Sequence, residues 1–160
     1  RFPVEIGDSI LVESGTVHAI DGGNLILEIQ QNSDTTYRVY DWGRVGLDGS
    51  PRQLHIAESL ASIDWAGVEQ YPVRAANVDA VIADSPLFRI RRAPLAAGTQ
   101  LSFAAAEQPR LLSVVNGAVS INGDQADTLG RGDNVLLPYA GEFTFKAESD
   151  AMILVTENFA

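Results

Sequence analysis

Residues 28 to 44 form a dense cluster of polar side chains. Its seventeen positions hold five charged residues, three amides, five hydroxyls and one indole, and a lone histidine, His18, lies ten residues upstream. A segment with a purely structural role rarely needs so many specific polar groups. A sugar site does, because each hydroxyl or phosphate requires its own partner. The cluster therefore predicts a binding or catalytic site for a sugar-like molecule.

Two glycines, Gly7 and Gly15, precede that cluster at a characteristic spacing from His18. Gly7 is followed by Gly15 and then by His18. Gly15 permits a tight turn, after which residues 16 to 20 are expected to form a strand. The spacing resembles the second signature motif of the cupin barrels, with Glu13 where proline is usual. In cupins the histidine of this motif is a metal ligand, so the resemblance implies that His18 points inward and binds a metal.

A longer run of residues narrows the resemblance. His18, residues 28–30, residues 33–41 and residues 54–56 together resemble the class I mannose-6-phosphate isomerases, and most closely their short bacterial form. The resemblance is strong over residues 5 to 64 and weaker beyond. It implies a zinc-dependent enzyme that interconverts mannose 6-phosphate and fructose 6-phosphate, with this chain as its C-terminal part.

The resemblance also implies roles for individual residues. Arg38 matches the active-site arginine of the family, where a fixed guanidinium would stabilise the negative charge of an enediol intermediate. Glu28 matches a family glutamate suited to proton transfer between C1 and C2 of the sugar. Tyr37, Asp41 and Arg44 would line the sugar pocket. The family draws its other zinc ligands, a glutamine, a histidine and a glutamate, from segments upstream of the histidine, and nothing like them occurs here, so the zinc site of His18 is expected to be incomplete.

Structural interpretations of the same residues stay open. A lone histidine such as His18 is often a packed or surface residue. Arg38 could be a solvated strand residue paired with Asp34 or Asp41, and Glu28 could hold a turn. Tyr37, Asp41 and Arg44 could simply anchor the end of a barrel.

Composition excludes several classes of function. The 160 residues are 46% hydrophobic and carry a formal charge of −10. This charge argues against binding to nucleic acid or to anionic membranes. The absence of cysteine excludes disulfides and thiolate zinc sites, and no apolar run is long enough for a membrane span. Together with the resemblance, these properties predict a cytoplasmic protein that binds a sugar phosphate.

Short apolar runs separated by glycine, asparagine and aspartate predict an all-β fold of cupin-type jelly-roll barrels. Residues 1–64 would form the C-terminal half of a first, catalytic barrel ending in a short helix over 53–64, and residues 65–85 a connector. Residues 86–160 would form a complete second barrel. In that barrel Gly132 to Gly141 nearly repeats the first glycine motif, but no histidine follows, which predicts a barrel without a metal site. The expected strands are 9–12, 16–19, 24–30 and 36–40 in the first block, and 87–92, 99–105, 110–116, 118–121, 125–129, 134–137, 142–146 and 151–156 in the second.

Three functional hypotheses follow. The chain begins at Arg1 and its only methionine is Met152, which favours a fragment of a longer isomerase. If the chain were a whole gene product, a degenerate cupin that binds a sugar without turning it over would be the alternative. The third hypothesis is an oligomerisation module, because half a barrel leaves unpaired strand edges. Under it, either a second copy or a missing N-terminal segment would complete the first barrel.

Overall fold

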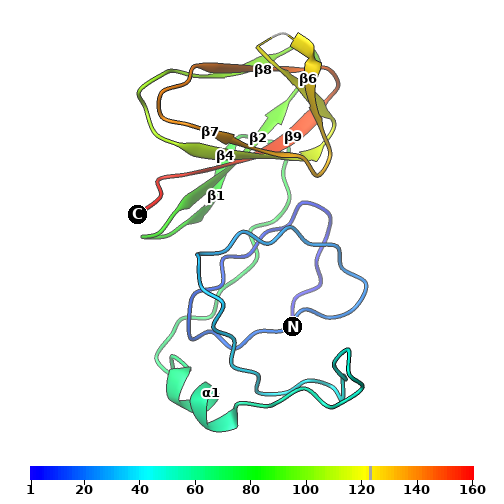
Figure 1. The fold of residues 1–160 in the computed structure, drawn as a ribbon, viewed down its shortest axis with the longest axis vertical. Coiled ribbons are helices and arrows are strands. Elements are labelled where there is room, and N and C mark those ends of the chain that lie inside the picture. The colour runs from blue at the N-terminus through cyan, green and yellow to red at the C-terminus, as the bar shows by residue number, and fades with distance from the viewer. Residues whose placement is uncertain (123) are drawn as a thin grey trace. The chain divides into compact units, whose positions relative to one another are not determined.

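The computed structural model describes residues 1–122 and 124–160, and the chain divides into two compact units (Figure 1). Unit 1 comprises Arg1–Leu11 and Tyr71–Ala160, and unit 2 comprises Val12–Gln70. The first eleven residues therefore group with the second half of the chain, whereas the sequence had suggested a first block of residues 1–64.

Unit 1 is built from two antiparallel β-sheets. Five strands form the first sheet in the order β1-β2-β9-β4-β7, and four form the second in the order β3-β8-β5-β6. Figure 1 shows the two sheets facing each other within this unit. The strands are β1 Ala80–Asp84, β2 Arg89–Leu95, β3 Gln100–Phe103, β4 Arg110–Asn116, β5 Ala118–Ile121, β6 Asp124–Gly130, β7 Asn134–Leu137, β8 Phe143–Ala147 and β9 Ala151–Glu157.

The core of unit 1 lies between the two sheets and is apolar. Side chains alternate between the faces of a strand, so Leu112 and Val114 of β4 point inward together, as do Ile153 and Val155 of β9. Phe145 is fully buried. Its ring meets that of Phe103 edge-on, with 6.1 Å between centroids. Large apolar side chains thus fill the interior of this barrel.

The prediction of an all-β fold with antiparallel sheets is confirmed, and so are the eight strands expected after residue 86. The strands over 110–116, 118–121 and 134–137 have the predicted limits. One strand was missed, because β1 lies in the predicted connector, where small residues gave no clear alternation. The turn predicted at Asn116 and Gly117 separates β4 from β5. In the turn predicted at Asn122 and Gly123, Gly123 lies outside the described residues.

Unit 2 contains one short helix, α1, at Ile56–Ser62, within the predicted range of 53–64. The four strands predicted over 9–12, 16–19, 24–30 and 36–40 are wrong. Of these four segments only the first takes part in an isolated bridge, between Ser9 and Val73, both of unit 1. A second isolated bridge joins Val45 to Pro51 within unit 2, and no strand occurs between residues 12 and 70, all of which are described. A strand is stable only when a neighbour satisfies its backbone N–H and C=O groups. These segments have the composition of strands but lack such neighbours.

None of the helices in the described ranges has the length and apolar character needed to cross a membrane.

Candidate functional site

The candidate site in unit 2 centres on the carboxylate of Asp41, the most buried charged group of that unit. Asp41 is 7% exposed. It accepts two hydrogen bonds from the guanidinium of Arg52, one of them from Nε at 2.6 Å. The Nε atom of Arg38 lies 3.8 Å from the same carboxylate. Asp41 therefore joins two arginines from different parts of the chain.

These arginines keep the Asp41 carboxylate ionised. The hydrogen bonds from Arg52 are the main cause that lowers its pKa below 3.8, and the charges of Arg52, Arg38 and Arg44 act in the same direction, while burial opposes them. In turn, Asp41 raises the pKa of Arg52 through the same hydrogen bonds. A carboxylate held in this state is a poor proton acceptor, which favours a role in ordering the arginines.

Arg38 is held by both its backbone and its side chain. Its N–H donates to Nδ1 of His55 at 3.2 Å, and its carbonyl accepts from the N–H of His55 at 2.9 Å. Its Nη1 donates to the carbonyl of Gln53 at 3.1 Å. The ring of Tyr37 meets that of His55 edge-on at 6.1 Å between centroids. The predicted active-site arginine thus has a defined position beside Tyr37.

Arg44 follows a tight turn that begins at Asp41. The N–H of Arg44 donates to the carbonyl of Asp41 at 2.9 Å. The two central residues, Trp42 and Gly43, have φ angles of 49° and 69°, as in a type I′ turn. The guanidinium of Arg44 lies 5.4 Å from the centre of the Trp42 ring, a cation–π distance. The turn therefore sets the positions of both side chains.

His18 and Glu28 do not join this cluster. Both side chains are exposed. Nδ1 of His18 lies 2.9 Å from the carbonyl of Thr16. Since a carbonyl can only accept, this contact is a hydrogen bond in the tautomer with the proton on Nδ1, and the neutral ring of that tautomer has its lone pair on Nε2. Glu28 makes no hydrogen bond or ion pair among the residues described here. The structure thus brings Tyr37, Arg38, Asp41 and Arg44 together, but not His18 or Glu28.

The donor atoms that the structure describes do not fit a complete zinc site. Within residues 1–122 and 127–160, no three His, Cys, Asp or Glu side chains lie close enough to hold a metal ion together. Zinc takes three or four protein ligands. His18 by itself has the arrangement usual for a ligand, with one ring nitrogen bonded to a carbonyl and the other free. It could supply one ligand of a site but not form one.

Sequence reasoning missed the contacts of Arg52 and His55. Neither residue belongs to a spacing or motif that predicts its contacts. The structure shows that Arg52 is the main partner of Asp41 and that His55 pairs with the backbone of Arg38. The expected pairing of Asp41 with an arginine was a usable signal, but the sequence did not show which arginine.

A shallow hollow lined by residues 30–34, all of them polar, lies in the same unit.

Comparisons with known proteins find that the chain is similar to mannose-6-phosphate isomerases. No family model matches it. It is 35% identical to the mannose-6-phosphate isomerase ManA of Bacillus subtilis over 161 residues, which is 96% of this chain and 50% of that protein. It is also 35% identical to the mannose-6-phosphate isomerase of Streptococcus mutans, over 86% of this chain and 45% of that protein. The crystal structure of the Bacillus subtilis mannose 6-phosphate isomerase superposes on this chain with a TM-score of 0.57 and 25% sequence identity. The match covers 80% of this chain and 42% of the chain in that crystal structure.

The fold of unit 1, two facing antiparallel sheets, is that of a jelly-roll barrel. The resemblance to the mannose-6-phosphate isomerases is confirmed, and the match is to their C-terminal portion. The chain spans about half the length of the curated relatives that it matches.

Proposed function

We propose that this chain carries part of the active site of an isomerase that interconverts mannose 6-phosphate and fructose 6-phosphate. The observation that carries the proposal is the similarity to mannose-6-phosphate isomerases along 96% of the chain. The fixed position of Arg38 beside Tyr37, Asp41 and Arg44 supports it independently, because a sugar phosphate requires several ordered cationic and hydroxyl groups.

The proposed reaction moves one proton between two carbons. A base removes the proton from C2 of the aldose while O1 is protonated, which gives an enediol. The proton then returns to C1 while O2 loses its own, and the ketose results. Negative charge builds on the two oxygens during both steps, and the guanidinium of Arg38 would stabilise it. Glu28 would carry the proton, which suits an exposed carboxylate with no partner of its own.

Tyr37, Asp41 and Arg44 are proposed to shape the sugar-phosphate pocket. Tyr37 is 45% exposed and Arg44 is exposed, so both can reach a ligand. The carboxylate of Asp41 is occupied by Arg52 and Arg38. Its contribution to binding would be to set the positions of these guanidinium groups.

We also propose that the reaction depends on zinc and that His18 supplies one of its ligands through Nε2. The bonding of Nδ1 to the carbonyl of Thr16 supports this role. The remaining ligands would lie outside this chain. When bound, zinc would act as a Lewis acid on a sugar oxygen. The assignment of His18 is tested by measuring the zinc content of a chimera that joins this chain to the half of Bacillus subtilis ManA that it does not cover, with and without H18A, and H18A should lower that content.

We propose that further polypeptide completes the first barrel. The enzyme is also proposed to be cytoplasmic. Sixteen large apolar side chains of unit 2 are exposed, among them Leu25 and Leu47. Exposed apolar groups in such number favour association with another surface. The partner is either a second copy or a segment equivalent to the half of the relatives that this chain does not cover. A monodisperse monomer of the 160-residue chain in light scattering would exclude the second copy.

The catalytic role is tested in a chimera. The half of Bacillus subtilis ManA that this chain does not cover is joined to residues 1–160, and conversion of mannose 6-phosphate is measured. The R38A variant should lose about 10²- to 10³-fold in kcat, the usual effect of removing one group that stabilises an oxyanion. R89A is the matched control, because Arg89 pairs with the exposed Asp84 in unit 1. A folded chimera in which R38A and R89A have equal activity would contradict the proposal.

A binding measurement keeps the proposal testable if the chimera does not fold. Both tryptophans, Trp42 and Trp65, lie in unit 2, so a W65F variant leaves Trp42 as the only indole. Mannose 6-phosphate should change its fluorescence, because the indole lies against the guanidinium of Arg44. Equal responses to mannose 6-phosphate, mannose and inorganic phosphate would show that the site does not recognise a sugar phosphate.

A further inference from the structure

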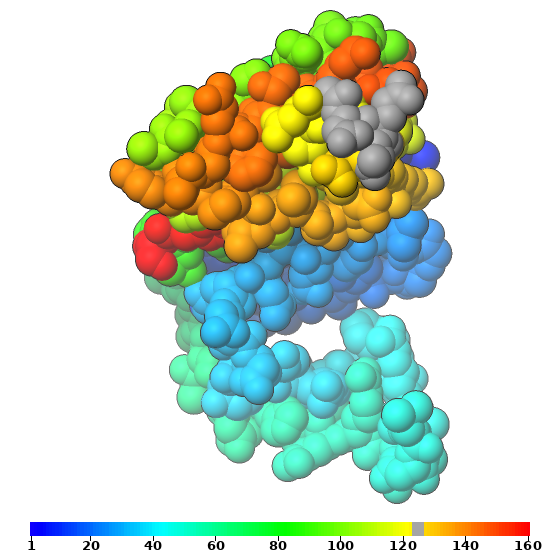
Figure 2. All heavy atoms as spheres, turned by 45° about the horizontal axis from the view of Figure 1, so that its top comes forward, coloured from blue at the N-terminus to red at the C-terminus, as the bar shows by residue number. Residues whose placement is uncertain are grey.

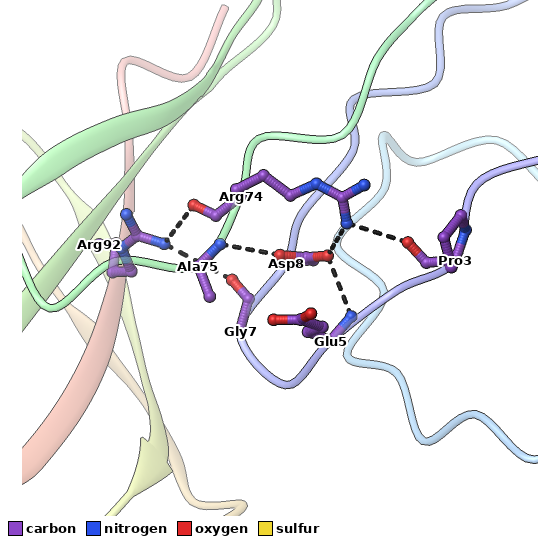
Figure 3. A network of polar contacts seen from close by, with 7 residues as sticks. All are labelled: Pro3, Glu5, Gly7, Asp8, Arg74, Ala75 and Arg92. Carbon is purple, nitrogen blue, oxygen red and sulfur yellow. Dashed lines mark hydrogen bonds and ion pairs between the residues drawn. The ribbon is translucent and has the colours of Figure 1, made fainter.

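The two segments that lead into and out of unit 2 are bonded to each other within unit 1 (Figure 3). Ser9 and Val73 form an antiparallel bridge, in which each N–H donates to the other's carbonyl at 3.0 and 2.8 Å. Ser9 lies three residues before unit 2 begins, and Val73 lies three residues after it ends. The bridge therefore closes residues 12–70 into a loop at its base.

Asp8 strengthens this junction. Its side chain is only 4% exposed. It accepts hydrogen bonds from the N–H of Glu5 at 3.0 Å, the N–H of Ala75 at 2.8 Å and Nη1 of Arg74 at 2.6 Å. Nη1 of Arg74 also donates to the carbonyl of Pro3 at 2.9 Å. Figure 3 shows Asp8 at the centre of these bonds. One buried carboxylate thus joins both segments by charge-assisted hydrogen bonds, which are stronger than neutral ones.

The backbone around Asp8 is shaped for a close approach of the two segments. Gly7 has a φ of +92°, and a Cβ added there would lie 3.1 Å from Cβ of Ala75. A side chain at this position would be strained and crowded. On the β2 side, Nη1 of Arg92 lies 3.5 Å from the carbonyls of both Gly7 and Arg74. The buried guanidinium of Arg92 therefore anchors both segments to the first sheet.

We propose that Asp8, Arg74 and the Ser9–Val73 bridge act as a clasp that fastens both ends of unit 2 and so maintains its order. Unit 2 needs such a device, because its buried residues are Asp41 and Ser59 and none is apolar. A region without an apolar core gains little from burial. Joining its ends removes conformational freedom from the whole loop. The clasp is independent of the proposed function, since it concerns the order of residues 12–70 and not what they bind.

The test is hydrogen–deuterium exchange, measured by mass spectrometry on the 160-residue chain. D8A should make the hydrogen-bonded amides within residues 12–70, such as those of Ser59 and Ile63, exchange roughly tenfold faster, because a set of charge-assisted hydrogen bonds at the base of the loop is lost. Peptides from β4 and β9 should keep their protection. D84N is the matched control, because Asp84 pairs with Arg89 in the same unit but lies outside the junction, and it should change neither region.

A disulfide provides the decisive second variant. Ser9 and Val73 are a hydrogen-bonded antiparallel pair, whose Cα atoms lie about 5.5 Å apart, within the range that a disulfide spans. The chain has no other cysteine to interfere. Added to D8A, the oxidised S9C/V73C pair should restore protection of residues 12–70, and reduction should remove it. The proposal is overturned if D8A changes only the peptides next to Asp8, if β4 and β9 lose protection equally, or if the disulfide restores nothing.

Discussion

The two units of this protein are stabilised in different ways. Every buried apolar side chain among the described residues lies in unit 1, between residues 82 and 155. Unit 2 buries a carboxylate, Asp41, and a hydroxyl, Ser59, and exposes most of its large apolar groups. In Figure 2 the green to red residues of unit 1 form a continuous mass, whereas the blue to cyan residues of unit 2 surround a gap that side chains do not fill.

The apolar core and the candidate site residues therefore lie in different units. The interior of the barrel of unit 1 is filled by apolar residues such as Phe145 and Leu112. The candidate site residues lie in the unit that lacks a core. Their order depends on ion pairs, on backbone contacts such as those between Arg38 and His55, and on the attachment of the unit's two ends. The polar candidate site thus lies in the unit that has no buried apolar side chains to stabilise it.

The largest expected effect comes from removing a ring of the barrel core. F145A should lower the free energy of unfolding of unit 1 by about 3–5 kcal/mol, because a fully buried aromatic side chain is replaced by a cavity. L47A in unit 2 should change it by less than about 0.5 kcal/mol, because Leu47 is fully exposed. Urea unfolding followed by far-ultraviolet circular dichroism measures both. A similar loss in the two variants would mean that unit 2 contributes apolar burial that the structure does not show.

A smaller effect is expected from a polar contact inside unit 1. Ser120 is fully buried, and its hydroxyl donates to Oε1 of Glu148 at 2.6 Å. S120A should cost about 1–2 kcal/mol of unfolding free energy, since a hydrogen bond to a carboxylate is lost. S102A is the control, because the exposed hydroxyl of Ser102 bonds to that of Thr144 and can bond to water instead. Equal losses in the two variants, measured by the same urea unfolding, would show that burial does not determine the cost.

The fold of unit 1 could be predicted because its signals are local. Short apolar runs mark β4 and β9, and the dipeptide of Asn116 and Gly117 marks the turn that follows β4. Each strand of this barrel also has its neighbours within the same chain, so local preference and pairing agree. The strand β1 was missed because it follows a stretch of small residues without a clear period.

The strands of unit 2 could not be predicted by the same reasoning. Residues 24–30 and 36–40 have strand composition, but strand formation depends on a partner that composition does not reveal. The candidate site could be predicted in part. The motif around His18 and the run from Glu28 to Arg44 carried the resemblance to mannose-6-phosphate isomerases, which is confirmed, whereas the roles of these residues stay predictions. The pairing of Asp41 with Arg52 could not be predicted from the sequence, because the two residues are eleven positions apart and no rule of spacing brings them together.

The smallest effect, and the one that bears most directly on the difference between the units, is the response to acid. Hydrogen bonds from Arg52 hold the pKa of Asp41 below its ordinary value of 3.8, and backbone hydrogen bonds from Glu5 and Ala75 do the same for Asp8. A carboxylate whose pKa is lower in the folded state stabilises that state fully above its unfolded pKa and loses the effect as pH falls through the folded value. Unit 2 should therefore keep its order from neutral pH down to about pH 4 and loosen below it.

The two tryptophans make this measurable, because both lie in unit 2 and none lies in the barrel. Their fluorescence should be constant above pH 4 and change below it, while the circular dichroism of the barrel changes at lower pH or not at all. D41N and D8N should each weaken the acid transition, because an amide does not titrate. If the fluorescence and the circular dichroism change together in every variant, the two units unfold as one. The separation of a stable barrel from a polar, tethered site would then be wrong, because unit 2 would draw its stability from the same core as unit 1.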